Sequence, residues 1–353
     1  MKSFAGHVSA VLIFVFATQA QQSGIPLADR FPGEHWDTIN PTAGGWDSAR
    51  LDRARDYATQ VGATTFMVIQ HGLVVLSQGD TAERTELHSC RKSFLGALIG
   101  IAVAEKTIGL DDTLDELGID DTAPALTAAE KQATVRDLLE SRSGVYHPSA
   151  YETNGMADQR PERGIHPPGT YWYYNNWDFN TLGAIYEKRT HHRIFDALKQ
   201  LIAKPIGMED FRASDGRYLF ETASRYPAYP IRMSSRDLAR FAQLYLHNGE
   251  WNGKQIVPAE WVKASVHPWS DTESGGYGYL WWTADSATSG FSPVYHFPKG
   301  SFWLEGHLGQ YAVVVPSQDL VIVFRVKGDH PEKEIHKRQA ANLVRLTVQA
   351  EVQ

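Results

Sequence analysis

Apolar positions near the start of the chain follow the spacing of a helix. Leu51, Ala54 and Ala58 fall on one face of a segment whose remaining positions are mostly polar. Ser48 precedes this segment, and a serine at that place is typical of a helix N-cap. The pattern predicts an amphipathic helix that begins after Ser48 and covers a hydrophobic core.

The next apolar segments have the composition of strands and then of a buried helix. Residues 64–70 and 73–77 are rich in β-branched and aromatic side chains, and His71-Gly72 between them favours a hairpin. Residues 93–105 are strongly apolar and rich in Gly and Ala. That length suits a buried helix better than a strand.

The middle of the chain has mainly helical patterns, whereas the last third has strand patterns. Between residues 111 and 248 the signals predict helices at 134–140, 181–189, 195–203 and 235–247. Strands are expected at 277–283, 301–305, 311–315 and 320–326, followed by a helix at 332–348. This order predicts one sheet assembled from both ends of the chain, with the helical region as an insertion.

The first twenty residues have the pattern of a secretory signal peptide. Lys2 precedes the apolar run 8–17, and Ala20 is a small residue at the expected cleavage site. The alternative, an N-terminal membrane anchor, needs about 20 apolar residues to span a bilayer. We therefore expect residues 1–20 to be removed and the protein to be exported, periplasmic or secreted, with no stable membrane insertion.

Composition narrows the class of protein further. The 353 residues include 41 acidic and 34 basic side chains, for a net charge of −7, and the basic residues do not cluster. A nucleic-acid-binding role is disfavoured, because such binding relies on clustered Lys and Arg. The only cysteine, Cys90, excludes an intramolecular disulfide and any metal site built from several cysteines.

One candidate for nucleophilic chemistry is the tetrapeptide from Ser89 to Lys92. At the start of a helix, positions i and i+3 share a face, so the hydroxyl and the amine can meet. Burial lowers the pKa of a lysine, and the apolar residues 94–99 are placed to bury this one. By itself the pattern is weak, since an ordinary capped helix start has the same residues.

Two later motifs offer further polar groups. Tyr174 and Asn176 stand two residues apart before a predicted helix, where a tyrosine could relay protons and an asparagine could hold a carbonyl. The alternative is an aromatic loop packed on the core. His307 and Gly309 precede the strand 311–315; a glycine there lets backbone approach a ligand, and the N–H of Gln310 could form half of an oxyanion hole. A simple turn is the alternative for this motif.

Taken in this order, the three motifs resemble those of the serine β-lactamase and penicillin-binding-protein superfamily. The class C-like branch, with its esterases, D-aminopeptidases and amide hydrolases, is most similar, because its second motif is Tyr-x-Asn. The resemblance extends over about residues 45 to 350. It implies an α+β fold: an antiparallel sheet flanked by the terminal helices, in an α/β lobe at about 45–105 and 265–350, with an all-helical lobe inserted at about 106–264.

The resemblance also implies a role for each motif residue. Ser89 would be the nucleophile that forms an acyl-enzyme, with Lys92 and Tyr174 together as the base. Asn176 would bind a substrate carbonyl or amide. The backbone N–H groups of Ser89 and Gln310 would form the oxyanion hole.

The third motif departs from the usual pattern, because His307 stands where the β-lactamases have a lysine. A histidine has no permanent charge at neutral pH. We therefore expect neutral esters to be better substrates than penicillins, whose carboxylate a lysine would meet. His307, Gly309 and Gln310 are the substrate-binding residues expected here, and no metal site is predicted.

The expected function is hydrolysis of a small ester or amide without a cofactor, in a single unit from residue 21 to 353. Alternatives on the same site are a β-lactamase or D-Ala-D-Ala carboxypeptidase, and a hydrolase of amide oligomers of the 6-aminohexanoate-dimer type. From another class, a non-catalytic ligand-binding sensor is disfavoured by the complete set of motif residues. The sequence predicts a small-molecule partner and leaves the oligomeric state open.

Overall fold

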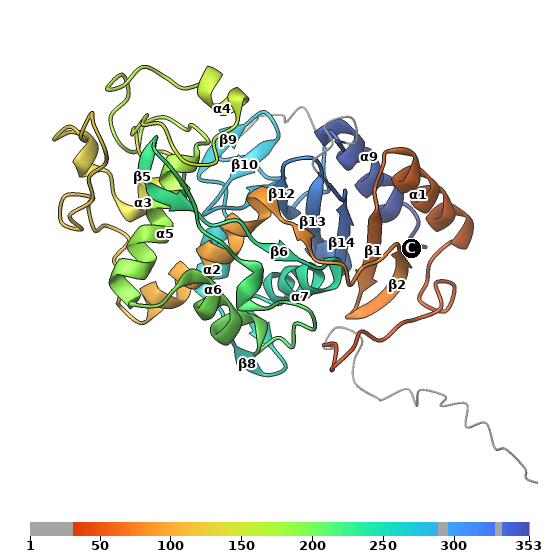
Figure 1. Cartoon of the computed structure of the whole chain (residues 1–353). Coiled ribbons are helices and arrows are strands. Elements are labelled where there is room, and N and C mark those ends of the chain that lie inside the picture. The colour runs from red at the N-terminus through yellow and green to blue at the C-terminus, as the bar shows by residue number, and fades with distance from the viewer. Residues whose placement is uncertain (1–30, 289–295, 329–333, 353) are drawn as a thin grey trace, which may run out of the picture.

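The structure is a computed structural model, and it describes residues 31–288, 296–328 and 334–352. The expected signal peptide, residues 1–20, lies outside the described residues. Figure 1 shows an α/β half with a large sheet and, beside it, a mainly helical half. The chain enters the sheet first, crosses into the helical half and returns to the sheet.

The large sheet joins the two ends of the chain, as the sequence predicted. Among the described residues it has eight strands in the order β2-β1-β14-β13-β12-β11-β10-β9, and all neighbours are antiparallel. Its strands are β1 (Thr65–Gln70), β2 (Leu73–Gln78), β9 (Ser270–Thr272), β10 (Gly275–Tyr277), β11 (Trp282–Thr283), β12 (Phe302–Gly306), β13 (Gln310–Val315) and β14 (Leu320–Arg325). The hairpin partners β1 and β2 form one edge of the sheet, and β1 pairs with β14.

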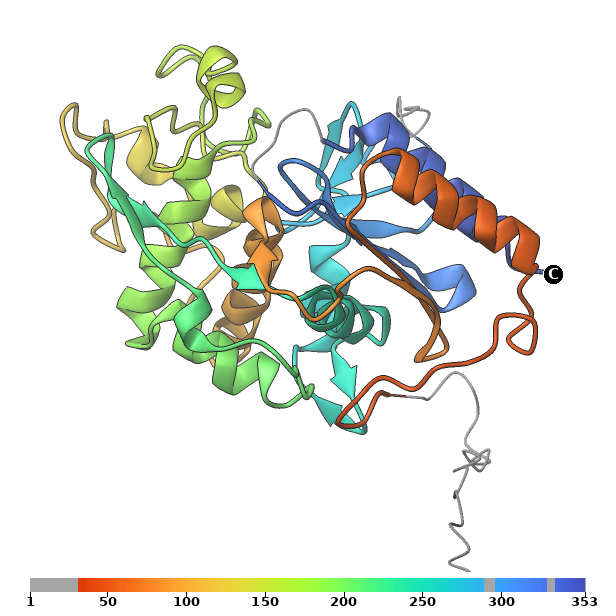
Figure 2. The same ribbon diagram turned by 45° about the vertical axis from the view of Figure 1, so that its right-hand side comes forward.

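Both faces of the central strands are buried, because helices cover each side. Phe66 and Val68 of β1 point to one face and Met67 and Ile69 to the other, as the two-residue period of a strand requires. The first face packs against α1 (Ser48–Gln60) and α9 (Lys337–Val348), which lie side by side in Figure 2. The second face packs against α7 (Ser235–Leu246).

The inserted lobe is mainly helical. Its α-helices are α3 (Val135–Leu139), α4 (Asn154–Asp158), α5 (Asn176–Thr190) and α6 (Ile194–Ala197), with α7 and α8 (Ala259–Ser265) on the return to the sheet. It also has short strands that the sequence did not predict: β4 (Leu219–Glu221), β5 (Ser224–Ala228), β6 (Arg232–Met233), β7 (Glu250–Trp251) and β8 (Lys254–Gln255). Strand β6 pairs with β3 (Thr85–Glu86), which connects the two lobes behind the first motif.

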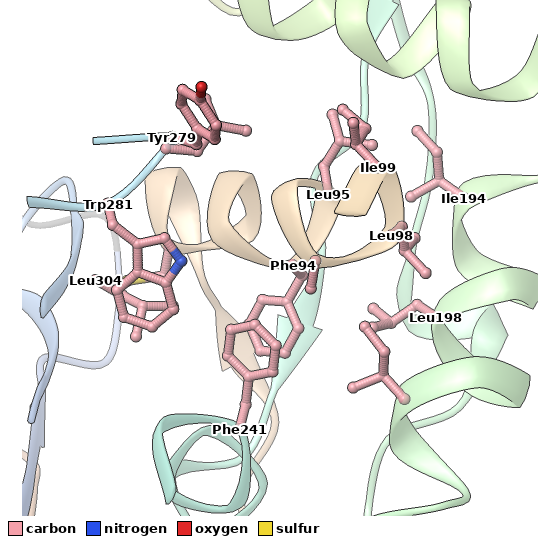
Figure 3. Close-up of a cluster of buried hydrophobic side chains, with 14 of the residues drawn as sticks. Phe94, Leu95, Leu98, Ile99, Ile194, Leu198, Phe241, Tyr279, Trp281 and Leu304 are labelled. Atoms are coloured by element: carbon pink, nitrogen blue, oxygen red, sulfur yellow. The ribbon is translucent and has the colours of Figure 1, made fainter. Parts of the chain in front are cut away.

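Helix α2 (Arg91–Ala104) lies between the lobes and is buried on almost every side. Figure 3 shows Phe94 pointing at Phe241 of α7, while Leu98 faces Leu198 at the start of the π-helix Leu198–Ala203 that follows α6. The Phe94 and Phe241 rings stack with centroids 3.8 Å apart. A helix that is hydrophobic all round belongs in a core, which is why 93–105 is so strongly apolar.

Several predicted boundaries were wrong for identifiable reasons. Helix α1 is capped by Asp47, whose carboxylate accepts from the N–H of Arg50 at 2.9 Å, and not by Ser48. Helix α5 begins at Asn176 rather than at 181, because Asn175 accepts from the N–H of Asp178 and acts as the cap. Helix α9 begins at Lys337; residues 332–333 of that prediction lie outside the described residues.

The predicted strand 277–283 is in fact two strands joined by a tight turn. The N–H of Gly278 donates to the carbonyl of Trp281, and Leu280 adopts a φ of 62°. A Cβ at position 278 would lie 2.0 Å from the carbonyl oxygen of Ser265, so only glycine fits this approach to the end of α8. The alternation of aromatic residues in this segment concealed the turn.

Candidate active site

Ser89 lies at the junction of a short 3-10 turn, His88–Cys90, and helix α2. His88 has a φ of 47°, which turns the chain sharply before the helix begins. The end of strand β12 packs against this turn. A Cβ on Gly306 would lie 2.4 Å from the carbonyl oxygen of Leu87, so a glycine is needed where the third motif meets the first.

The amine of Lys92 connects the first two motifs. Its Nζ lies 2.8 Å from Oγ of Ser89 and 2.6 Å from the hydroxyl oxygen of Tyr174. The three-residue spacing on α2 brings Lys92 to Ser89, as expected. Tyr174 comes from the loop before α5, so this contact also holds the helical lobe against α2.

Burial sets the charge state of this amine. Lys92 is 2% exposed and lies over the rings of Tyr174 and Phe179, 4.3 and 4.5 Å from their centroids. Desolvation lowers the pKa of Lys92 well below its ordinary value, and the positive charge of Arg91 lowers it further. The environment therefore favours the neutral amine, which can accept a proton.

The hydroxyl of Tyr174 is held in its protonated form. Burial raises the pKa of Tyr174 strongly, and a hydrogen bond with Ser89 only partly opposes this effect. The rings of Phe179, Tyr277 and Trp282 surround the tyrosine, with centroids 4.9 to 5.9 Å from its own. The phenolate form of Tyr174 is therefore disfavoured in the resting site.

Two cavities open beside the nucleophile, and Ser89 and His307 line both of them. The larger has a volume of about 620 Å³, and the smaller about 350 Å³. Walls of the larger cavity include Trp172, Tyr174, Trp282, Glu305, Tyr311 and Lys337. The smaller cavity is lined by His88, Arg91, Tyr151, Asn176 and Leu308, among others. A substrate carbonyl at Ser89 would have space on both sides.

The third motif forms the turn between β12 and β13. His307 lies between the cavities, with its ring edge-on to His88 at a centroid distance of 5.6 Å. Gly309 has a φ of 96°, and a Cβ there would lie 2.7 Å from that of Ile335. The close packing of the turn against Ile335 is therefore enough to require glycine at this position.

The side chain of Gln310 is turned away from both cavities. Its Nε2 donates to the carbonyl of Val326 at 2.8 Å, and its Oε1 accepts from Nε of Arg325 at 2.8 Å. The role expected for Gln310 belongs to its backbone N–H, which the side-chain position does not affect. That role stays a prediction.

Asn176 opens helix α5 on the wall of the smaller cavity. Its Nδ2 donates to the carbonyl of Tyr151, whereas its Oδ1 is buried with no hydrogen-bond partner among the described residues. Substrate binding by Asn176 stays a prediction, and Oδ1 is the atom that could accept a hydrogen bond from a substrate.

Sequence reasoning did not identify three charged residues near the nucleophile. Glu305 and Lys337 face the larger cavity 3.5 Å apart, and Arg91 lines the smaller one. Only Arg91 was detectable, since it lies inside the first motif. Among the aromatic residues near the site, Tyr151, Trp172 and Trp282 line the cavities, while Trp281 and Trp303 are fully buried.

Other kinds of site were searched for across the described ranges. His, Cys, Asp and Glu side chains do not gather there in any group of three or more that could hold a metal ion. No helix in this part of the chain is both long and apolar enough to cross a bilayer. Cys90 is buried, and burial raises the pKa of its thiol to about 12, so it is a packing residue in this site.

The chain belongs to the beta-lactamase family: residues 49–346 match the model of the family described as Beta-lactamase. The expected class, a serine hydrolase with a β-lactamase/transpeptidase-like fold, is confirmed at this level. A relative from Alkalihalophilus pseudofirmus, an uncharacterized protein, is 26% identical over 292 residues, which are 74% of this chain and 82% of the relative.

Two solved structures illustrate the range of proteins with this fold. One, assigned as a 6-aminohexanoate-dimer hydrolase from Bacillus anthracis, has a TM-score of 0.64 and 21% identity, covering 91% of this chain and 86% of that one. A family VIII carboxylesterase has a TM-score of 0.60 and 15% identity, covering 85% of this chain and 97% of the other. At these identities the likeness concerns the fold.

Proposed function

We propose that the protein hydrolyses a small ester or amide through an acyl-enzyme on Ser89. The observation that carries this proposal is the position of Lys92 Nζ, within 2.8 Å of Ser89 Oγ and 2.6 Å of the Tyr174 hydroxyl. A serine hydroxyl becomes a nucleophile only when a neighbouring group takes its proton. The buried, neutral amine is such a group.

In the first half of the reaction, Oγ of Ser89 attacks the substrate carbonyl carbon while its proton passes to Nζ of Lys92. The carbonyl oxygen becomes an oxyanion, for which the backbone N–H groups of Ser89 and Gln310 are the expected donors. Tyr174 then passes a proton to the leaving oxygen or nitrogen and regains one from the Lys92 ammonium. The bond to the leaving group breaks, and the acyl-enzyme remains.

In the second half, water attacks the acyl carbon and gives its proton to the same pair of groups. The bond to Oγ breaks, Ser89 regains a proton, and the carboxylic acid leaves. We assign the role of base to Lys92 and the role of relay to Tyr174, because burial favours the neutral amine and the protonated phenol. The reverse assignment would require a phenolate that burial disfavours.

Neutral acyl esters are the substrate class that the third motif supports best. His307 lies between the cavities without the permanent charge of a lysine, so a substrate carboxylate has no fixed cation at that position. The carboxylesterase among the structural neighbours agrees with this choice. β-Lactams are expected to be poorer substrates than small esters.

An amide-oligomer hydrolase is a second candidate, favoured by the larger cavity. Its wall has both a carboxylate, Glu305, and an ammonium, Lys337, beside the rings of Trp172 and Trp282. A linear ω-amino-acid amide has both charges too, separated by an apolar chain. One structural neighbour of this chain is assigned as a hydrolase of such an amide, the 6-aminohexanoate dimer.

Covalent labelling tests the proposed function before any substrate is known. A fluorophosphonate should modify the wild type at Ser89, as located by mass spectrometry of the labelled peptide, and Ser89→Ala should not react. Ser93→Ala is the matched control, since Ser93 lies on the same helix with its hydroxyl bonded to the carbonyl of Leu280. Labelling of Ser89→Ala at the wild-type rate would contradict the proposal. A panel of p-nitrophenyl esters, nitrocefin and 6-aminohexanoate dimer then separates the substrate classes.

A further inference from the structure

Arg91 is a buried cation that has no ion-pair partner in the part of the chain that the structure describes. It is 1% exposed, and Nη1 donates a hydrogen bond to the carbonyl of His88 at 3.0 Å. Nε and Nη2 have no hydrogen-bond partner among the described residues, and no carboxylate of those residues forms an ion pair with the guanidinium. Burying such a charge is costly unless it is paired.

Two tyrosine rings hold the guanidinium in place. Its carbon lies 5.2 Å from the ring centroid of Tyr151 and 5.0 Å from that of Tyr229. Cation–π contacts offset part of the desolvation cost but leave the positive charge intact. An arginine cannot lose its proton at physiological pH, so the charge is permanent.

Lys92, the next residue along the chain, has no carboxylate in contact with its amine among the described residues. The groups in contact with Lys92 or acting on its charge are the hydroxyls of Ser89 and Tyr174, the buried thiol of Cys90, the ring of Phe179 and the guanidinium of Arg91. Glu305 acts on this cluster through Tyr174 and Cys90, and Tyr277 and Tyr229 act on Tyr174. Among the described residues, the charged side chain that acts on Lys92 is Arg91, whose positive charge lowers the pKa of the amine.

We propose that Arg91 is a positioning residue whose fixed positive charge keeps the amine of Lys92 unprotonated and ready to accept the proton of Ser89. The inference rests on the proposed function, because it assumes that Lys92 is the base. It explains why a charge that lowers stability lies inside the core at this place. The lowered pKa of Lys92, caused first by burial and then by Arg91, agrees with this reading.

The pH dependence of serine labelling tests this role. Labelling of Ser89 by a neutral fluorophosphonate should rise with pH as Lys92 loses its proton. In Arg91→Met the amine of Lys92 keeps its proton to higher pH. At the lower pH values, where the labelling rate rises with pH (the acid limb), the rate should therefore fall about tenfold. At high pH, where the rate is constant, it should stay within about twofold of the wild type.

A second buried arginine provides the matched control. Arg240 on α7 is 0% exposed, forms an ion pair with Glu209 at 3.2 Å and donates to the carbonyl of Ile206 at 3.1 Å, and it lines neither cavity beside Ser89. Arg240→Gln should lower thermal stability without changing the pH dependence of the rate at which Ser89 is labelled. A uniform loss of rate in Arg91→Met at every pH, with the limb unmoved, would show a structural role only and overturn the inference.

A direct titration covers the case in which Arg91→Met does not fold. Lysine labelled with ¹³C at Cε, with the Lys92 signal assigned by its loss in Lys92→Arg, reports protonation without any reaction. In Arg91→Gln this signal should titrate at higher pH than in the wild type, and an unchanged midpoint would overturn the inference. Absence of labelling at Ser89 in the wild type would instead contradict the proposed function and the inference together.

Discussion

Nε of Arg325 donates a hydrogen bond to Oε1 of Gln310 at 2.8 Å, in a layer of the core behind the nucleophile. The same guanidinium donates to the backbone carbonyls of Thr85, Glu86 and Met233. One buried arginine thus ties the third motif to the β3–β6 connection between the lobes. The backbone of the third motif is fixed from behind, on the side opposite the substrate cavities.

Replacing Gln310 should therefore separate stability from catalysis. Gln310→Met removes both side-chain hydrogen bonds and leaves a buried donor of Arg325 unpaired, which should cost about 1–3 kcal/mol in the free energy of unfolding. The backbone N–H is retained, so kcat/KM for a small ester should stay within about fivefold at a temperature where the variant is folded. Urea unfolding and ester hydrolysis measure the two quantities. A large loss of rate at unchanged stability would mean that the side chain meets the substrate.

Lys92 and Tyr174 should behave as one unit in kinetics. Lys92→Met and Tyr174→Phe each remove one group of a relay whose atoms lie 2.6 Å apart, so each should slow acylation by about 100-fold or more. The double variant should be only a little slower than the worse single variant, because the relay is already broken. Single-turnover acylation measures this coupling. Fully additive losses would show that the two groups act independently.

His307→Lys should move the preference of the enzyme toward anionic substrates. A permanent ammonium between the cavities would meet the carboxylate of a β-lactam, so kcat/KM for nitrocefin relative to p-nitrophenyl butyrate should rise by about tenfold or more. His336→Lys is the control, since His336 also lines the larger cavity but its side chain is 69% exposed. An equal rise in both variants would point to net charge rather than to the position of residue 307.

Glu140 should make stability fall as pH rises. Burial raises the pKa of Glu140 from 4.5 to about 7, with the negative charge of Asp137 adding to the effect and Arg142 opposing it. Between about pH 4.5 and 7 the unfolded chain releases this proton while the folded chain keeps it, so the folded state loses stability over that range. Glu140→Gln should therefore raise the free energy of unfolding by about 2 kcal/mol at pH 8 and have little effect at pH 4.

The control for Glu140 is Glu130, a carboxylate whose pKa is lowered rather than raised. Burial alone would raise the pKa of Glu130, but hydrogen bonds from Arg163 and Thr127 outweigh it and hold the pKa below its ordinary value. Glu130→Gln should therefore destabilise the protein at pH 8. Chemical unfolding of both variants at the two pH values measures the opposite signs, and stabilisation by both would contradict the assignment of Glu140.

The main features of the fold could be predicted because its strands are unusually apolar. Segments 64–70, 311–315 and 320–326 are buried on both faces, which explains why they read as strands without alternation. The turn at Gly278 could not be predicted, because its cause is the carbonyl of Ser265 on a different element. The local sequence pattern carries no information about a backbone carbonyl that packs against the turn from a different element.

The candidate site, too, could be predicted only in part from the sequence. The meeting of Ser89 and Lys92 follows from helical spacing, and the buried position of the lysine follows from its apolar neighbours on α2. The environment of Arg91 depends on Tyr151 and Tyr229, which arrive from loops far along the chain. A tetrapeptide shows that an arginine is present but not whether a carboxylate accompanies it in space.

The pairing of β1 with β14 also determines when in biosynthesis the enzyme can form. Strand β1 is made early, yet its partner β14 is the last strand in the described part of the chain, and α9 follows it. Until then β1 has an open edge and two apolar faces, and contacts this distant in sequence form slowly. A chain that stops before residue 320 would therefore be an aggregation-prone fragment with an intact Ser89 and Lys92, rather than a smaller hydrolase.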